Sequence, residues 1–82
     1  MGRIFDDKKV NITGERIKEA RIRAKMSQEE LSAKLETLAV YICRGSISRI
    51  ENRERTVTDI ELDGIAKILN VSINYLFGRP EC

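Results

Sequence analysis

The chain has 82 residues, of which 41% are hydrophobic and 34% are charged, and its formal net charge is +2. That length and balance predict a single domain with one modest core. They argue against a membrane protein, because no apolar run approaches the roughly 20 residues that span a bilayer, and the N-terminus carries no secretory signal. We therefore expect a cytoplasmic protein with no membrane contact.

The cysteine and histidine content argues against a metal site and against most catalytic mechanisms. The chain has two cysteines, Cys43 and Cys82, and no histidine, so it lacks the four ligands that a zinc site needs. A disulfide between them is not expected in a reducing compartment. The commonest general base is absent, and no nucleophile has an apparent partner. The sequence therefore predicts no metal, no cofactor, no evident small-molecule ligand and no enzymatic activity.

A mixed polar segment precedes the first predicted helix. Residues 1–12 scatter apolar side chains among charges and are interpreted as an N-terminal arm. Thr13 is a candidate N-cap for a helix over about 14–25. Three apolar residues recur at helical spacing in that helix and predict a buried stripe. They are Ile17, Ala20 and Ala24.

A capping-box pattern marks the second predicted helix. Ser27 is followed three residues later by Glu30, so each side chain can accept a hydrogen bond from the other residue's backbone N–H. We expect a helix over about 28–35 that can run on to 39. Residues 40–43, Val-Tyr-Ile-Cys, are β-branched or apolar and uncharged. They predict a buried connector, with a short strand as the alternative.

A third helix, over about 44–52, has one apolar side and one polar side. Ile47 and Ile50 lie three residues apart and predict the buried side. The other side and its flanks carry small residues and hydrogen-bond donors, which are Gly45, Ser46, Ser48, Arg49, Asn52 and Arg53. Short side chains permit close approach to another surface, and arginine donors match guanine edges and phosphates. The pattern favours a helix in a DNA major groove; a solvated face with routine charges is the alternative.

Two further helices follow a charged loop over 53–57. Thr58 and Glu61 repeat the capping-box pattern before a strongly amphipathic helix. The apolar positions of that helix are Leu62, Ile65, Ala66 and Leu69. Asn70 is placed for a left-handed helix end, and a last short helix is expected over 73–77.

The predicted organisation is all-α, with five short helices and no internal repeat. The N-terminal arm precedes a domain over 13–79 and a C-terminal tail over 80–82. Positive charge is unevenly distributed along the domain. Residues 15–25 carry five basic and two acidic side chains, and residues 44–55 carry four arginines and two glutamates. This asymmetry indicates a binding surface for a polyanion.

Three motifs follow one another along the domain. They are Ser27-Gln-Glu-Glu-Leu31, Ile47-Ser-Arg-Ile-Glu-Asn52 and Ile65-Ala-Lys-Ile-Leu-Asn-Val-Ser-Ile-Asn-Tyr-Leu76. Together they resemble the Cro/phage-repressor (XRE) family of helix-turn-helix regulators, and the resemblance covers residues 14–78. It implies a compact five-helix, lambda-repressor-like DNA-binding domain whose helix-turn-helix is formed by the second and third helices. It also implies binding to double-stranded DNA as a homodimer, with the third helix in the major groove.

The sequence departs from this family before the third helix. The connector is longer than the family's usual one, and Glu36 stands where the family commonly has glycine. We therefore expect a long-connector variant. Cys43 stands at the N-cap, where the family prefers serine or threonine. A helix N-terminus lowers the pKa of a thiol, so oxidation of Cys43 could switch binding. An inert buried cysteine is the alternative.

The resemblance assigns DNA contacts to the third helix and its surroundings. The candidates for base edges are Arg44, Gly45, Ser46 and Arg49. Arg49 is the leading one because it is mid-helix on the outer side, whereas Arg44 can hold a phosphate instead. The candidates for the sugar-phosphate backbone are Gln28, Asn52, Arg53 and Arg55. Arg21 and Glu51 resemble an ion pair of the family that joins the first and third helices, a structural role.

The function implied by the resemblance is sequence-specific DNA binding in transcription regulation, most often repression by occluding a promoter. Residues 71–77 are the best candidate for a dimer contact, so we expect a homodimer through the region of the fourth and fifth helices. An antitoxin, or another protein-interaction module with the same fold, is the alternative. An enzyme is the least supported class.

Overall fold

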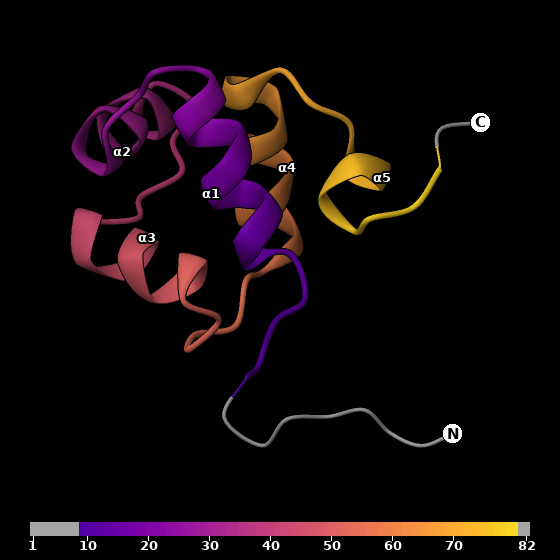
Figure 1. Cartoon of the computed structure of the whole chain (residues 1–82). Coiled ribbons are helices and arrows are strands. Elements are labelled where there is room, and N and C mark those ends of the chain that lie inside the picture. Colours follow the sequence, from indigo (N-terminus) through magenta and orange to yellow (C-terminus); the bar gives the residue numbers. More distant parts are fainter. Residues whose placement is uncertain (1–8, 81–82) are drawn as a thin grey trace.

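The computed structural model describes residues 9–80, and within them the chain forms five α-helices and no strand (Figure 1). The helices are α1 (Gly14–Arg23), α2 (Gln28–Glu36), α3 (Arg44–Glu51), α4 (Asp59–Leu69) and α5 (Ile73–Leu76). The predicted all-α, five-helix fold is confirmed. Most of the predicted arm, and Cys82 in the predicted tail, lie outside the described residues. No helix in the described part is long and apolar enough to cross a membrane.

Two helix starts are closed by the capping boxes that the sequence predicts. At α2, Ser27 Oγ accepts from the Glu30 backbone N–H at 3.0 Å, and Glu30 Oε1 accepts from the Ser27 N–H at 2.7 Å. At α4, Thr58 and Glu61 make the same two bonds at 3.2 and 3.1 Å. Each box satisfies two backbone N–H groups reciprocally. Both helices therefore begin where the sequence predicts.

α1 begins at Gly14, as predicted, but the Thr13 side chain does not cap it. Thr13 has φ −102° and ψ −12°, and its side chain makes no cap bond. An N-cap needs an extended backbone for its oxygen to reach the first helical N–H groups, and Thr13 is already nearly helical. Asn11 Oδ1 instead accepts from the Gly14 N–H at 2.8 Å. The Thr13 hydroxyl is buried and has no hydrogen-bond partner among the described residues.

Each of the five helices is followed, within three residues of its end, by a residue with a left-handed backbone. These residues have φ between 58° and 72° and are Lys25, Ala39, Arg53, Asn70 and Gly78. After α2, the Ala39 N–H donates to Glu36 O at 2.9 Å and the Val40 N–H donates to Leu35 O at 3.0 Å. This is the Schellman arrangement, in which glycine or asparagine usually occupies the left-handed position. The left-handed end predicted at Asn70 is confirmed.

The core is built from the apolar sides of all five helices. Its fully buried large side chains are Ile17, Leu31, Leu35, Ile47, Ile50, Ile65 and Leu76. The stripe predicted for α1 is wrong at Ala24, which follows the end of the helix at Arg23 and is exposed. α1 and α4 occupy the centre, with α2 and α3 on one side and α5 on the other (Figure 1). α3 therefore lies at an edge of the molecule.

The connector between α2 and α3 is buried at alternate residues. Val40 and Ile42 are 7% and 3% exposed, whereas Tyr41 and Cys43 are exposed. Ser32 Oγ donates to the Ile42 carbonyl at 2.6 Å and fixes the connector against α2. The prediction of a buried connector is therefore right for two of its four residues. It is wrong for the other two because an alternating segment turns only every second side chain inward.

Candidate nucleic-acid interface

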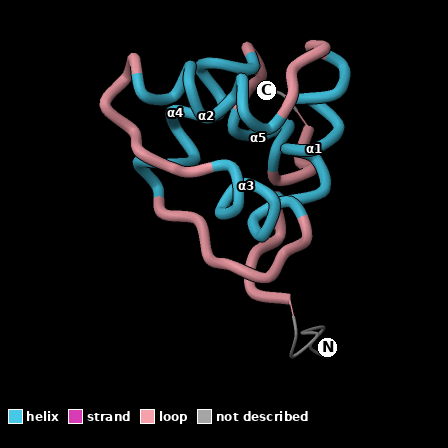
Figure 2. Tube along the Cα trace, turned by 90° about the vertical axis from the view of Figure 1, so that its left-hand side faces the viewer, coloured by secondary structure: helices cyan, strands magenta, loops and turns pink. Residues whose placement is uncertain are grey.

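α3 has one buried side and one open side. Ile47 and Ile50 are each 1% exposed and face the core. The exposed or half-buried residues of the open side and its flanks are Arg44, Gly45, Ser46, Ser48, Arg49 and Asn52. In Figure 2, which is turned by 90° from Figure 1, α3 lies at the front of the molecule. A Cβ added at Gly45 would meet no atom within 4 Å, so the first turn of α3 opens directly outward.

A buried ionic cluster holds the inner side of α3 to α1 and α2. Arg21 Nε donates to Glu51 Oε2 at 2.6 Å, and Arg21 Nη2 donates to Glu51 Oε1 at 3.0 Å. Gln28 Nε2 donates to the same Oε1 at 3.0 Å, and Arg21 Nη1 donates to Met26 O at 2.8 Å. A bidentate arginine–carboxylate pair is both strong and directional. The cluster therefore fixes the rotation of α3 about its own axis, which decides which residues face outward.

An open hollow lies where the starts of α2 and α3 meet. It has a volume of about 600 Å³ and is lined by Arg21, Ser27, Gln28, Glu29 and Arg44. Gln28 gives one amide N–H to Glu51, and its NH₂ group carries a second donor. The first backbone N–H groups of α2 also open at this end. The hollow therefore offers donors suited to a phosphate, and Arg44 stands beside them.

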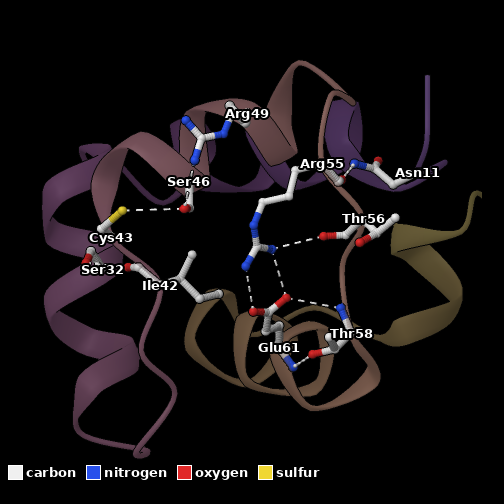
Figure 3. Close-up of polar contacts among 10 residues, drawn as sticks. All are labelled: Asn11, Ser32, Ile42, Cys43, Ser46, Arg49, Arg55, Thr56, Thr58 and Glu61. Atoms are coloured by element: carbon white, nitrogen blue, oxygen red, sulfur yellow. Dashed lines mark hydrogen bonds and ion pairs between the residues drawn. The ribbon is translucent and has the colours of Figure 1, made fainter. Parts of the chain in front are cut away.

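The first turn of α3 carries a short chain of polar contacts on its surface (Figure 3). The Cys43 thiol donates to Ser46 Oγ at 3.4 Å, and Arg49 Nη2 donates to the same oxygen at 3.4 Å. The Ser46 side chain, then its backbone N–H and the nearby Arg49 charge, lower the pKa of the Cys43 thiol. Cys43 is exposed, so the alternative of an inert buried cysteine is wrong. Control of binding by its oxidation stays a prediction.

The two arginines that follow α3 are held by the protein itself. Arg55 makes a bidentate pair with Glu61, with both N–O distances at 3.0 Å, and donates to Thr56 O at 2.9 Å (Figure 3). The Arg55 guanidinium lowers the pKa of Glu61. Arg53 is half-buried, and its Nε donates to Asn11 O at 2.7 Å. The DNA-backbone roles of Arg53 and Arg55 stay predictions; both side chains also hold the loop between α3 and α4.

Asn11, which belongs to no recognised motif, holds the C-terminal end of α3. Its Nδ2 donates to the carbonyls of Ile50 at 3.1 Å and Arg55 at 2.8 Å, while its Oδ1 caps Gly14. Lys9 Nζ donates to Asn52 O at 3.1 Å and the Val10 N–H donates to Arg53 O at 2.9 Å, so residues 9–11 of the predicted arm lie against this end of the helix. The partners of Nδ2 lie 39 and 44 residues away in the chain, so no local pattern could have identified them.

The open α3, supported from behind by α2, defines a helix-turn-helix DNA-binding domain. A comparison with protein families matches the helix-turn-helix family over residues 17–76, from α1 to the last residue of α5. The chain belongs to the Cro/phage-repressor (XRE) type of this family, whose members are DNA-binding regulators, and the resemblance seen in the sequence is confirmed. Comparisons with curated proteins and with solved structures find no match.

Proposed function

We propose that this protein is a sequence-specific regulator of transcription that inserts the open side of α3 into the major groove of double-stranded DNA. The contrast between the two sides of α3 carries the proposal. The inner side is fixed by the Arg21–Glu51 pair, while Gly45 and Arg49 on the other side are exposed. The major groove is about 12 Å wide and admits one helix, whose N-terminal residues contact base edges.

Arg49 is the proposed principal base reader. Its fork of donors can pair with guanine O6 and N7, which is worth about 1–3 kcal/mol of discrimination. Its contact with Ser46 lays the side chain along the exposed surface of the helix. Gly45 leaves room for the helix backbone to approach the bases. Arg44 shares a hollow with Gln28, which supports a phosphate contact for it as well as a base contact.

Backbone contacts at both ends of the recognition unit would position α3 without reading sequence. Gln28 at the start of α2 is one clamp, and Asn52, exposed after α3, is the other. Arg53 and Arg55 would add positive charge beside Asn52 while they hold the loop. Each neutralised phosphate releases counterions, so affinity is expected to fall steeply with salt.

A homodimer through the region of α4 and α5 completes the proposal. One helix-turn-helix reads few base pairs, too few to find a site among the roughly 10⁶ or more competitors in a genome. A two-fold dimer places two recognition helices about 34 Å apart, one turn of DNA. Ile60 on α4 and Ile73 on α5 are 69% and 38% exposed, which supports a contact there. Bound at a promoter in the cytoplasm, such a dimer would act as a repressor by occlusion.

Selection of duplexes from random DNA tests the proposal. The selected site should contain two half-sites in inverted repeat, about 10 base pairs apart centre to centre. Titration at about 50 and 200 mM salt should show a large loss of affinity at the higher concentration. A folded protein that binds no duplex at either concentration would contradict the proposal and leave a protein-interaction module as the alternative.

Two substitutions separate base reading from backbone contact. Arg49→Ala should relax the preference at one base position and cost about 1–3 kcal/mol there. Arg53→Ala should weaken binding to selected and unrelated duplexes nearly equally. Thermal unfolding of both variants controls for the bond between Arg53 and Asn11. A uniform loss across sequences for Arg49→Ala would show that Arg49 does not read a base.

A further inference from the structure

Tyr41 is the most exposed large hydrophobic side chain in the described part of the chain, at 74%. The connector is anchored on both sides of it. Before it, the Val40 side chain is buried and the Val40 N–H donates to Leu35 O at 3.0 Å. After it, the buried Ile42 accepts at its carbonyl from Ser32 Oγ at 2.6 Å. The outward direction of Tyr41 is therefore set by the fold.

The Tyr41 phenol has no interaction partner in the described part of the chain. Among the described residues it takes part in no hydrogen bond and no ring contact. The second tyrosine, Tyr75, differs: its hydroxyl accepts from Arg23 Nη2 at 3.2 Å, and its ring lies 5.5 Å from the same guanidinium. A tyrosine combines an apolar ring with a polar tip and serves where one end is packed and the other is hydrogen-bonded. Tyr41 offers both ends to another molecule.

Tyr41 stands at the N-terminal end of α3, two residues before the N-cap Cys43. The hollow beside it, of about 390 Å³, is lined by Ser32, Glu36, Tyr41, Ile42, Cys43 and Ser46. Arg49 Nη2 donates at 3.4 Å to the hydroxyl of Ser46, which lines this hollow, so the α3 side of the hollow is favourable to an anion. Glu36, on the α2 side, would repel an anion inside the hollow. We therefore expect a phosphate to bind at the rim of the hollow.

The two hollows at the start of α3 lie on opposite flanks of the helix. Arg44 lines the first hollow and Ser46 lines the second. Residues that are two positions apart in an α-helix point in directions about 200° apart around its axis. A helix in the major groove has a row of phosphates on each flank. Gln28 and Arg44 face one row. On the other flank, Tyr41 offers an exposed hydroxyl donor at this end of the helix.

We propose that Tyr41 is a further DNA-contacting residue, whose phenol O–H donates to a phosphate oxygen on the flank opposite Gln28. The inference rests on the proposed function. Tyrosine hydroxyls are among the side-chain donors that contact phosphates, and such contacts position a protein without reading sequence. The long connector would thereby add one phosphate contact to the DNA interface.

The test compares Tyr41→Phe, which removes one hydroxyl and keeps the ring, with the unaltered protein. Binding is measured on the duplex selected by the unaltered protein and on an unrelated duplex. Tyr41→Phe should weaken binding to both by about 3- to 10-fold, the effect of one lost hydrogen bond. Tyr41→Ala should weaken it at least as much. Unfolding midpoints of the Tyr41 variants should match the unaltered protein, because the side chain is exposed.

A second readout follows the Tyr41 ring itself. The chain has two tyrosines and no tryptophan, so the emission of the unaltered protein minus that of Tyr41→Phe is the emission of Tyr41. That emission should change when the selected duplex saturates the protein. Unchanged emission, unchanged binding by Tyr41→Phe, or a loss confined to one base position would each overturn the inference while the proposed function stands. Failure of the unaltered protein to bind any duplex would overturn both.

Discussion

The two ends of α3 differ in how many contacts hold them to the rest of the protein. At the C-terminal end, Asn11 donates to two backbone carbonyls, and Arg55 is paired with Glu61. At the N-terminal end, Cys43 makes no cap bond, and a Cβ on Gly45 would meet no atom within 4 Å. The helix is thus held from its inner side and its C-terminal end, and its first turn is left open to another molecule. Substitutions at the held end should change stability first, and substitutions at the open end should change binding first.

Removal of Glu51 is the largest expected effect. Its side chain is 2% exposed and paired with Arg21, so Glu51→Ala leaves a buried guanidinium without its counter-charge. Such a loss costs about 3–5 kcal/mol of the free energy of unfolding. Urea unfolding measures it, with Glu54→Ala as the control, because Glu54 is exposed and should change stability by under about 0.5 kcal/mol. A loss below about 1 kcal/mol for Glu51→Ala would show that the pair does not hold α3.

Asn11→Ala should cause the next largest loss in the free energy of unfolding. It leaves the Ile50 and Arg55 carbonyls and the Gly14 N–H without their side-chain partner. Unsatisfied groups of this kind cost about 1–3 kcal/mol together with the lost bonds. Asn52→Ala is the matched comparison, because this exposed amide should leave the unfolding free energy nearly unchanged and weaken DNA binding. Equal stability of the two variants would contradict the view that Asn11 holds the helix end.

Much of the fold follows from patterns of three or four residues. The capping boxes at Ser27 and Thr58 need a partner only three positions away, so both are visible in the sequence. The inward positions Ile47 and Ile50 follow from helical spacing in the same way. The outward direction of Arg49 then follows without any knowledge of the rest of the chain.

The remaining features depend on how the chain packs in three dimensions, which no short sequence pattern indicates. In the sequence Arg55 is one of several charged residues of a loop, and only the fold brings Glu61 against it. Ala39 has φ +61° because the next residue, Val40, must turn back into the core. That packing overrides the backbone preference that places glycine at such positions. The same turn displaces Tyr41 outward, which no local pattern indicates.

The Arg55–Glu61 pair makes the held end sensitive to pH. Arg55 lowers the pKa of Glu61 from its usual 4.5, so the contribution of the pair is complete above pH 4.5 and is lost as pH falls through the lower folded value. Glu61→Gln, which can keep the capping box, should reduce the unfolding free energy by about 1 kcal/mol at neutral pH. Urea unfolding between about pH 7 and pH 3 should show the difference shrinking below pH 4.5. A constant difference would mean that the carboxylate charge is not the source.

Gly45→Ala is the smallest expected change in stability and the sharpest test of the open end. Glycine inside a helix costs about 0.5–1 kcal/mol relative to alanine. Gly45 is not among the left-handed residues and has free space around a Cβ, so alanine should raise the unfolding free energy by up to that amount. If the first turn of α3 approaches DNA closely, the same methyl group must weaken binding to the selected duplex. Urea unfolding and duplex titration should therefore move in opposite directions. A more stable protein that binds equally well would show that DNA does not come closest at Gly45.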